Sequence, residues 1–571
     1  MKRLFPAPRG VKRQDPMPRA TQSRGRLFIS TGALRWLLVV AALLTGTTMT
    51  AGARSAAGPQ MGGTLIYAPP VPSAVDSFIP VMSTASILDD EVEVLLYRPL
   101  LWIGQHVTIE MDRSIADTIS VSANNTVFTV GMRHTYAWSD GQPVTADDVA
   151  YDFNLIKTYG PKYAYYGIGG LPTLVKSFKV LSPYSFAITL TKSVNPDWFK
   201  LNGLAQLRPL PAHAWKKYSI SYLFNHQTDL NVLSVVDGPY KLTKFVTGQY
   251  ARFDRNPTYG GHKSYLDTYI MQFYTSEQAE FAALKTGAAQ IGDLPFALYN
   301  SASQLSALKT YDVNNFQFHW IVLNYRNPAT SFFREVKVRQ AMQLAIDQPL
   351  MNSLLYHGHA NSAYSPVPFV PDTYVSPHAK ATQNASHFDL ARANAMLDAD
   401  GWKMVNGVRQ KNGQKLSWTL QLLGSQTDVK QGAILQQDFA KIGVDLKLQN
   451  IPISTLFAEF GHKGTEWDGI SIFWIYYPNF DPIGAGIFDT TGGANFGSFS
   501  DPRMDALINK AQVTPGLEGV YAYQDYASQV VPCLYLDQPT IIAKYQPNVH
   551  GITDFFNPVY AYSPEYLWLS H

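Results

Sequence analysis

Hydrophobic and polar residues alternate along several short segments of the chain, a pattern that predicts half-buried β-strands. The alternation is clearest at 128–132, 186–190 and 416–422. In other segments the apolar residues recur three and four positions apart, which predicts amphipathic helices over 146–157 and 338–346. Strands and helices are mixed along the whole chain, so the pattern predicts an α/β fold.

The segment 416–450 carries the clearest local unit. Its alternating start is followed by helical spacing from Ile434 to Ile442, then by Gly443 and a second alternating stretch. A strand, a helix and a strand in that order predict parallel sheet covered by helices. We find no fixed-period repeat and no linker of flexible composition, which favours two lobes joined by short crossing strands.

Composition and charge exclude several classes of protein. Of 571 residues, 46% are hydrophobic and 16% are charged, which excludes a disordered chain. Residues 1–60 hold ten of the 46 basic residues and one of the 43 acidic ones, which leaves residues 61–571 with a net charge of −6. A net negative charge offers no positively charged surface to which nucleic acid could bind. A lone cysteine, Cys533, excludes a disulfide framework and any zinc site built from several thiolates.

The first 57 residues read as an export signal. A basic stretch precedes a nine-residue apolar run, 36–44, which is followed by the small-residue pattern Ala51-Gly52-Ala53. The run is shorter than the roughly 20 residues that span a bilayer. We therefore expect cleavage and a soluble protein in the periplasm or at the cell surface. No cysteine near the cleavage site could carry a lipid anchor.

The usual motifs of catalysis and cofactor binding are absent from the sequence: there is no G-x-S-x-G, H-E-x-x-H, P-loop or G-x-G-x-x-G. We predict no catalytic residue, no cofactor and no metal site. His357 and His359 form a close pair, which we assign to a loop. The acidic run 89–93 is predicted to be the solvated face of a helix, and Cys533 a small buried residue.

Three ordered segments resemble one known family. They are Trp138–Val149 (with Asp140-Gly141, Thr145-Ala146 and Asp148), Asp237–Tyr259 (with Gly238-Pro239-Tyr240 and Arg255-Asn256-Pro257) and Leu323–Asp347 (with Val338-Arg339-Gln340-Ala341). Together they are similar to the extracytoplasmic solute-binding proteins of ABC importers, family 5, the oligopeptide, dipeptide and nickel-binding type. Capping, turns and core packing also account for these residues, so they indicate the fold rather than the site.

The resemblance implies a bilobal fold of the type II, cluster C periplasmic-binding-protein kind. Lobe I would comprise 62–85, 210–315 and 532–571, with a subdomain inserted at 86–209, and lobe II would comprise 316–531. Two strands near Asn314–Asn324 and Pro532–Leu536 would form the hinge. A ligand would lie in the cleft between the lobes, and hinge closure would bury it.

The resemblance implies a protein that binds its ligand and does not alter it chemically. The protein would bind an oligopeptide or a similar-sized polar solute and deliver it, unaltered, to the membrane permease of an ABC importer. We expect a monomer with no enzymatic activity.

The family's cleft loop corresponds to 467–482 of this chain. In peptide-binding members, an Asp three residues after the Trp pairs with the ligand's α-ammonium, and that position is Tyr477 here. Free-amino peptides are therefore in doubt unless Asp481 takes that role. The candidate ligand-binding residues are Tyr67, His319, Trp320, Asn324, Trp474, Tyr476, Tyr477, Asn479 and Asp481.

Other functions stay open from the sequence. Low charge and abundant Tyr and Trp favour an oligosaccharide as ligand, and His357 and His359 are a weak argument for a metal chelate. A secreted hydrolase, with carboxylates that sequence cannot pair, and a chaperone-like protein are alternatives of other classes.

Overall fold

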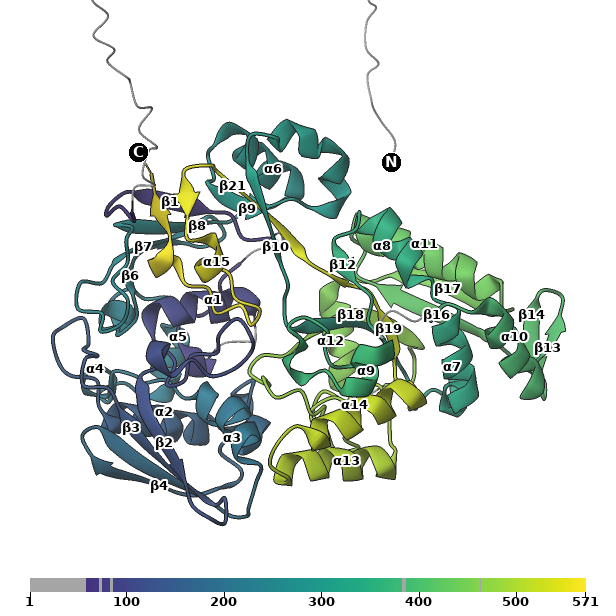
Figure 1. Cartoon of the computed structure of the whole chain (residues 1–571), viewed down its shortest axis with the longest axis horizontal. Coiled ribbons are helices and arrows are strands. Elements are labelled where there is room, and N and C mark those ends of the chain that lie inside the picture. The colour runs from purple at the N-terminus through teal and green to yellow at the C-terminus, as the bar shows by residue number, and fades with distance from the viewer. Residues whose placement is uncertain (1–57, 71–73, 83–85, 383–386, 463, 571) are drawn as a thin grey trace, which may run out of the picture. The chain divides into compact units, whose positions relative to one another are not determined.

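The computed structural model describes residues 58–570 apart from 71–73, 83–85, 383–386 and 463 (Figure 1). The predicted export signal at 1–57 lies outside the described residues. Among the residues that are described, no helix is long and apolar enough to span a membrane. Helices and strands alternate along the chain as predicted, and they form sheets that define two lobes.

A seven-stranded sheet forms lobe I and joins both ends of the described chain. Its strands, in spatial order, are β10 (Lys309–Val313), β21 (Ile541–Tyr545), β9 (Ile291–Asp293), β1 (Thr64–Tyr67), β8 (Thr268–Gln272), β7 (Tyr250–Arg255) and β6 (Tyr240–Val246). β1 pairs in parallel with β8 and β9, while β21 pairs antiparallel with β9 and β10. Helix α1 (Ile87–Leu96) follows β1 and helix α6 (Glu277–Thr286) precedes β9.

A four-stranded antiparallel sheet lies within the segment that we expected to be an inserted subdomain. Its strands are β2 (Ala116–Val121), β3 (Val127–Met132), β5 (Ser185–Leu190) and β4 (Val175–Ser182). Helices α2 (Ala146–Tyr159) and α3 (Pro196–Asn202) belong to the same segment. Thr145 and Asp148 form the predicted capping box of α2, with the Thr145 amide donating to the Asp148 carboxylate at 2.9 Å.

The sheet of lobe II has five strands in the order β17 (Asp445–Asn450), β16 (Ser417–Leu422), β18 (Gly469–Ile475), β11 (Gln317–Leu323) and β19 (Leu534–Leu536). β16 and β17 run parallel and are linked by α11 (Gln426–Ala440), so the predicted strand–helix–strand unit is confirmed. The other helices of this lobe are α7 (Val336–Leu344), α8 (Gln348–Leu355), α9 (Pro377–Thr382), α10 (Leu390–Ala399), α12 (Ile453–His462), α13 (Pro502–Val513) and α14 (Glu518–Val530).

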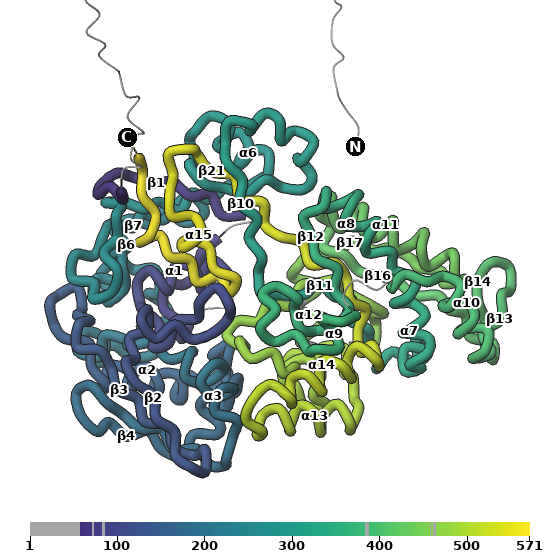
Figure 2. The backbone as a smooth tube through the Cα atoms, viewed as in Figure 1, coloured from purple at the N-terminus to yellow at the C-terminus, as the bar shows by residue number. Residues whose placement is uncertain are grey.

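The chain crosses between the two sheets twice. One crossing joins β10 to β11 and the other joins β19 to β21, which lie close together in the backbone trace (Figure 2). The Gln538 side-chain amide donates to the Asn315 carbonyl at 2.5 Å, so the crossings touch. Because β19 pairs with β11, the second crossing lies at 537–540, after the Pro532–Leu536 segment that we expected to form it. The lobe boundaries otherwise stay a prediction.

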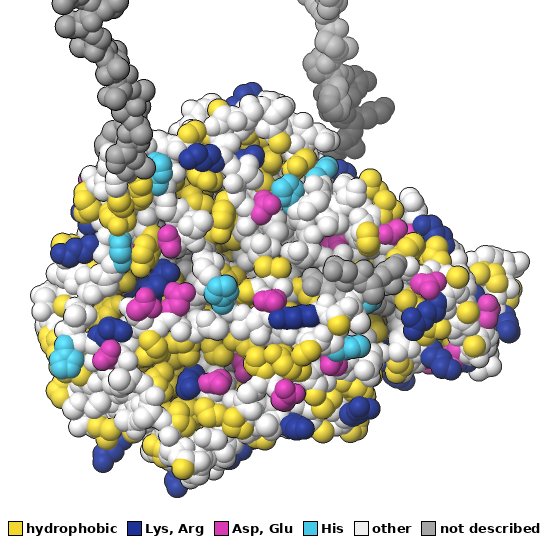
Figure 3. Space-filling view, in the orientation of Figure 1, with side chains coloured by type: hydrophobic (Ala, Val, Ile, Leu, Met, Phe, Trp, Pro, Cys, Tyr) yellow, Lys and Arg dark blue, Asp and Glu magenta, His cyan; other side chains and the backbone are white. Residues whose placement is uncertain are grey.

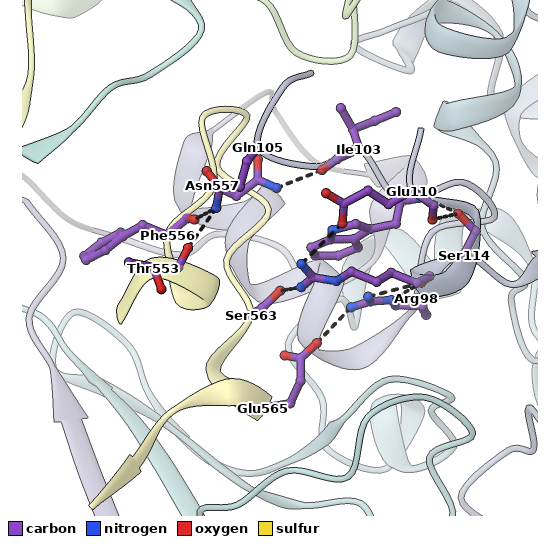
Figure 4. A network of polar contacts seen from close by, with 12 residues as sticks. Arg98, Ile103, Gln105, Glu110, Ser114, Thr553, Phe556, Asn557, Ser563 and Glu565 are labelled. Atoms are coloured by element: carbon purple, nitrogen blue, oxygen red, sulfur yellow. Dashed lines mark hydrogen bonds and ion pairs between the residues drawn. The ribbon is translucent and has the colours of Figure 1, made fainter. Parts of the chain in front are cut away.

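A polar network attaches the C-terminal segment to residues 98–114 of lobe I (Figure 4). The Arg98 guanidinium pairs with Glu565 at 3.1 Å, and both side chains are buried. Arg98 also lies over the Trp102 ring at 3.6 Å. The side-chain amide of Asn557 donates to the Ile103 carbonyl at 2.7 Å. This network holds the segment 557–565 against residues 98–114.

Candidate functional site

A cavity of about 1240 Å³ is lined from both lobes. Lobe I and its inserted segment contribute the first two turns of α1, the loop 164–169 and residues of α3. Lobe II contributes the end of β18 and the loop that follows it. The polar and aromatic residues central to the lining are Asp90, Glu91, Tyr165, Trp198, Asn202, Trp474, Tyr476, Tyr477, Asn479, Asp481 and Asp489.

The predicted cleft loop does supply cavity residues. β18 ends at Ile475, and Trp474, Tyr476, Tyr477, Asn479 and Asp481 all line the cavity. The Trp474 ring is half-buried, and its indole N–H has no hydrogen-bond partner among the described residues. Tyr476 is only 1% exposed and donates its hydroxyl to the Pro366 carbonyl at 2.6 Å, so it borders the cavity mainly as core.

Tyr477 links the two lobes. Arg208, from the inserted segment, donates a hydrogen bond to the Tyr477 hydroxyl, and its guanidinium also pairs with Glu93 of α1 at 3.3 Å. The Tyr477 ring meets Tyr165 edge-on, with ring centroids 5.7 Å apart. The position at which the resemblance led us to expect an Asp is thus occupied by a phenol that is already hydrogen-bonded.

A second link joins Asn202 of α3 to Asp481. The Asn202 amide donates to the Asp481 carbonyl at 3.0 Å and accepts from the Asp481 backbone N–H at 2.7 Å. These two bonds fix the backbone of Asp481, and its side-chain carboxyl group is part of the cavity wall. Its Oδ1 atom has no hydrogen-bond partner among the described residues. Burial raises the pKa of this carboxyl to about 7, and nearby Asp197 adds to the shift.

The acidic run of α1 is not a solvated face, and that prediction was wrong. All four acids are buried, with exposed fractions of 0% for Asp89, 4% for Asp90, 4% for Glu91 and 1% for Glu93. Asp89 accepts from the Ser77 backbone amide. Asp90 accepts from the Tyr165 hydroxyl at 3.0 Å, and Glu93 meets Arg208. A charged run can be buried when the protein supplies partners of this kind.

Burial also changes the proton affinity of these acids. It raises the pKa of Asp90 to about 8, although Arg208 and the hydrogen bond from Tyr165 act in the opposite direction. It holds the pKa of Glu91 well above its usual range, and the neighbouring charge of Asp90 adds to that effect. The Glu91 Oε2 atom has no hydrogen-bond partner among the described residues.

These shifts predict that the ligand-free protein loses stability as pH rises. Asp481 has a folded-state pKa of about 7 against a reference of 3.8, so the folded state binds more protons between those values. Its stabilising contribution is complete below pH 4 and is lost as pH rises through 7. Urea titration near pH 5 and near pH 8 should show a loss on the order of 2 kcal/mol from this group alone.

Asp481→Asn is the control for that titration, because the amide does not titrate. The variant should show a smaller difference between the two pH values than the wild-type protein. Equal stability of the wild-type protein near pH 5 and near pH 8 would contradict the assignment.

Four predicted residues, Tyr67, His319, Trp320 and Asn324, do not line the cavity. Tyr67 is 2% exposed and packs against Phe555. The other three lie in or just after β11, a central strand that pairs with β18 and β19 and whose seven residues are all buried.

The contacts of these residues are structural. His319 meets the Ser471 hydroxyl at 2.9 Å, and burial lowers its pKa to about 3. Trp320 packs edge-on against Phe488. Asn324 donates to the Trp467 carbonyl at 2.9 Å. His357 and His359 also lie outside the cavity lining, and His359 pairs with Asp312 at 2.9 Å.

Sequence reasoning missed the cavity residues of lobe I: Glu91, Tyr165, Trp198 and Asn202. One signal was available for Glu91. The acids of α1 stand between apolar residues in the helix ILDDEVEVLL, whose sequence leaves no wholly polar face. Nothing comparable distinguishes Trp198 or Asn202 in the sequence.

A large cavity lined from two lobes, with few polar groups among aromatic walls, is typical of proteins that bind a solute between lobes. The model of the family described as bacterial extracellular solute-binding proteins, family 5 Middle, matches residues 110–495. The chain belongs to the bacterial extracellular solute-binding proteins, family 5. It is thus an extracytoplasmic solute-binding protein of the ABC importer type, as the sequence predicted.

Known proteins support this placement. The chain is 24% identical over 512 residues to the oligopeptide-binding protein AppA of Bacillus subtilis. The aligned region covers 87% of this chain and 88% of that protein. It is 26% identical over 378 residues to the nickel-binding periplasmic protein of Escherichia coli, across 64% of this chain and 67% of that protein. Both relatives are named as binding proteins.

Solved structures confirm the predicted fold. AppA of Bacillus subtilis in complex with a nonapeptide superposes with a TM-score of 0.72 at 22% identity, covering 90% of this chain and 100% of that one. NikA of Brucella suis in complex with Fe(III)-EDTA superposes with a TM-score of 0.74 at 20% identity, covering 89% and 100%. At such identities the likeness concerns the fold, and the ligand of this chain must be argued from its own cavity.

Proposed function

We propose that this protein captures an oligopeptide or a similar-sized polar solute in the cavity between its lobes and delivers it unaltered to a membrane permease. Residues 1–57 would direct its export, and it would act as a monomer. No bond of the solute is made or broken. The ligand-binding residues that we propose are Trp474, Tyr477, Asn479 and Asp481, with Glu91, Tyr165, Trp198 and Asn202 from the facing lobe.

The observation that carries this proposal is that the cavity and the contacts closing it use the same residues. Tyr477 and Asp481 line the cavity, and they also make the hydrogen bonds to Arg208 and Asn202 across the lobes. A solute that contacts both walls would therefore favour the arrangement in which these cross-lobe bonds form. Closure is driven by contacts that exist only in that arrangement.

The face of the molecule drawn in Figure 3 gives no support to a polyanionic ligand. On the face drawn in Figure 3, basic and acidic side chains are interspersed rather than gathered by sign. A nucleic-acid-binding protein would present a basic stripe or patch. We therefore propose that the ligand is a small solute.

Native mass spectrometry of the purified full-length protein tests the proposal. We expect a non-covalent adduct with the mass of a small solute, released at the same mass when the protein is unfolded in acid. A protein that carries no adduct and gains no thermal stability from any peptide, sugar or chelate would contradict the proposal.

Trp474→Ala should weaken binding of that solute roughly tenfold or more, since the indole offers a large flat contact to the cavity. The half-buried ring is not in the deepest core, so the free energy of unfolding should change far less than for a buried Trp. Isothermal titration and urea titration measure the two effects. Trp320→Ala, a change in the core, is the control and should chiefly destabilise the fold. A Trp474→Ala protein that binds as tightly as the wild type would remove this residue from the site.

A further inference from the structure

The charge of the cavity lining is one-sided. Four acids line it, namely Asp90, Glu91, Asp481 and Asp489, and none of the described residues that line it is Lys, Arg or His. Arg208, which contacts the lining residue Tyr477, is occupied by Glu93 and Tyr477. An anionic group of a solute would meet no counter-charge among the described residues of this lining.

Two of the four acids, Glu91 and Asp481, have a carboxyl oxygen without a hydrogen-bond partner among the described residues, whereas the other two have donors. Asp90 accepts from the Tyr165 hydroxyl, and Asp489 accepts from the Thr491 amide at 2.8 Å and hydroxyl at 2.6 Å. By contrast, Glu91 Oε2 and Asp481 Oδ1 have no hydrogen-bond partner among the described residues, although the two residues are only 4% and 2% exposed. Buried carboxylate oxygens of this kind are costly unless a donor or a cation meets them.

The two acids also stand on opposite walls. Glu91 belongs to α1, at the start of the segment 86–209 that we expected to be inserted in lobe I, whereas Asp481 follows β18 in lobe II, with its backbone fixed by Asn202. We propose that the solute carries two positively charged groups, one held by Glu91 and the other by Asp481. This inference rests on the proposed function of the same cavity and adds the chemical class of the ligand: a dication with little or no negative charge.

Such a solute would couple binding to closure. A single cation can satisfy one wall, while the carboxyl on the other wall keeps its proton and gains no charge contact with the ligand. A dication reaches both carboxylates only when the lobes are together, so its affinity for the closed arrangement exceeds its affinity for the open one. The aromatic faces of Trp474 and Tyr165 would add cation–π contacts along its length.

A set of amidated tripeptides tests the class directly. Lys-Ala-Ala, Ala-Lys-Ala and Ala-Ala-Lys amides each carry two cations at different spacings and no carboxylate. Their Nα-acetyl, Nε-acetyl and doubly acetylated forms remove one or both charges. Isothermal titration of the full-length protein at neutral pH should show that at least one dication binds roughly tenfold more tightly than either of its singly acetylated forms.

Two isosteric variants assign the charges to the walls. Glu91→Gln and Asp481→Asn should each weaken the best dication roughly tenfold, and each should abolish the advantage of one particular ammonium group. Asp489→Asn is the matched control, because that carboxylate lines the same cavity but already has donors. Its affinity for the dication should stay within about twofold of the wild type.

The inference is overturned if the doubly acetylated peptides bind as tightly as the dications, if no dication binds, or if both variants keep wild-type affinity. These outcomes separate it from the proposed function. A neutral or anionic solute found in the native mass spectrum would overturn the dication while the solute-binding role stands. Absence of any adduct and of any binding would overturn both.

Discussion

Arg208→Met is expected to destabilise the protein by about 3–5 kcal/mol, the usual result of removing one partner from a buried charge pair. The guanidinium is buried and acts on three buried carboxyls, Asp90, Asp152 and Glu93. Methionine fills a similar length but supplies no charge, so these carboxyls would be left without a cation. The variant would also lose the hydrogen bond to Tyr477 that joins the lobes.

Two measurements separate these consequences. Urea titration gives the loss of stability, and isothermal titration of the folded protein gives the loss of ligand affinity, which should be roughly tenfold or more. Tyr477→Phe is the matched variant, because it keeps every charge and removes only the cross-lobe hydrogen bond. It should weaken binding with a small change in stability. If Arg208→Met unfolds at wild-type urea concentrations, the charge cluster is not holding α1 in place.

Arg98→Met is the second large effect, of about 3–5 kcal/mol as well, for the same physical reason. The change leaves Glu565 buried at 1% exposure without its ion pair, and it also removes one of the two guanidinium groups over the Trp102 ring, the other being that of Arg113. This network joins the C-terminal segment to residues 98–114 and lies outside the cavity lining (Figure 4). The loss should therefore appear in stability alone.

The same two titrations check this expectation, and the pair of Arg→Met variants forms the comparison. The folded fraction of Arg98→Met should bind the solute as the wild type does, whereas Arg208→Met should not. Weakened affinity in Arg98→Met, measured where the protein is fully folded, would show that the network of Figure 4 influences the cleft.

Local features of the fold were predictable because neighbouring residues determine them. The capping box at Thr145 and Asp148 needs only a spacing of three residues. The strand–helix–strand unit of β16, α11 and β17 needs only a change of period between adjacent segments. The position of the cleft loop came from the resemblance, and five predicted residues of that loop do line the cavity.

The rest of the site depends on contacts between distant parts of the chain. Glu91 and Asp481 face one cavity because α1 and the loop after β18 meet there, which no local pattern encodes. The same dependence on distant contacts explains why His319, Trp320 and Asn324 do not line the cavity. Their polar and aromatic character suggested a cleft, but the pairing of β11 with β18 and β19 places them in the core.

The acids of α1 illustrate why charge patterning misled. An acidic run usually indicates a solvated surface, since isolated burial of a carboxylate is costly. Here Tyr165 and Arg208, both from the inserted segment, stabilise Asp90 and Glu93. Only the assembled fold shows that these partners exist, and only there does Glu91 stand out as an acid that both lines the cavity and has an oxygen without a hydrogen-bond partner among the described residues.

Small-angle X-ray scattering with and without the solute tests most directly whether two lobes close around a guest. The solute is the one identified by native mass spectrometry, removed by partial unfolding and added back at saturation. We expect a smaller radius of gyration with solute present and recovery of the solute at its original mass. Identical scattering curves at saturation, or a solute returned as altered products, would contradict this expectation.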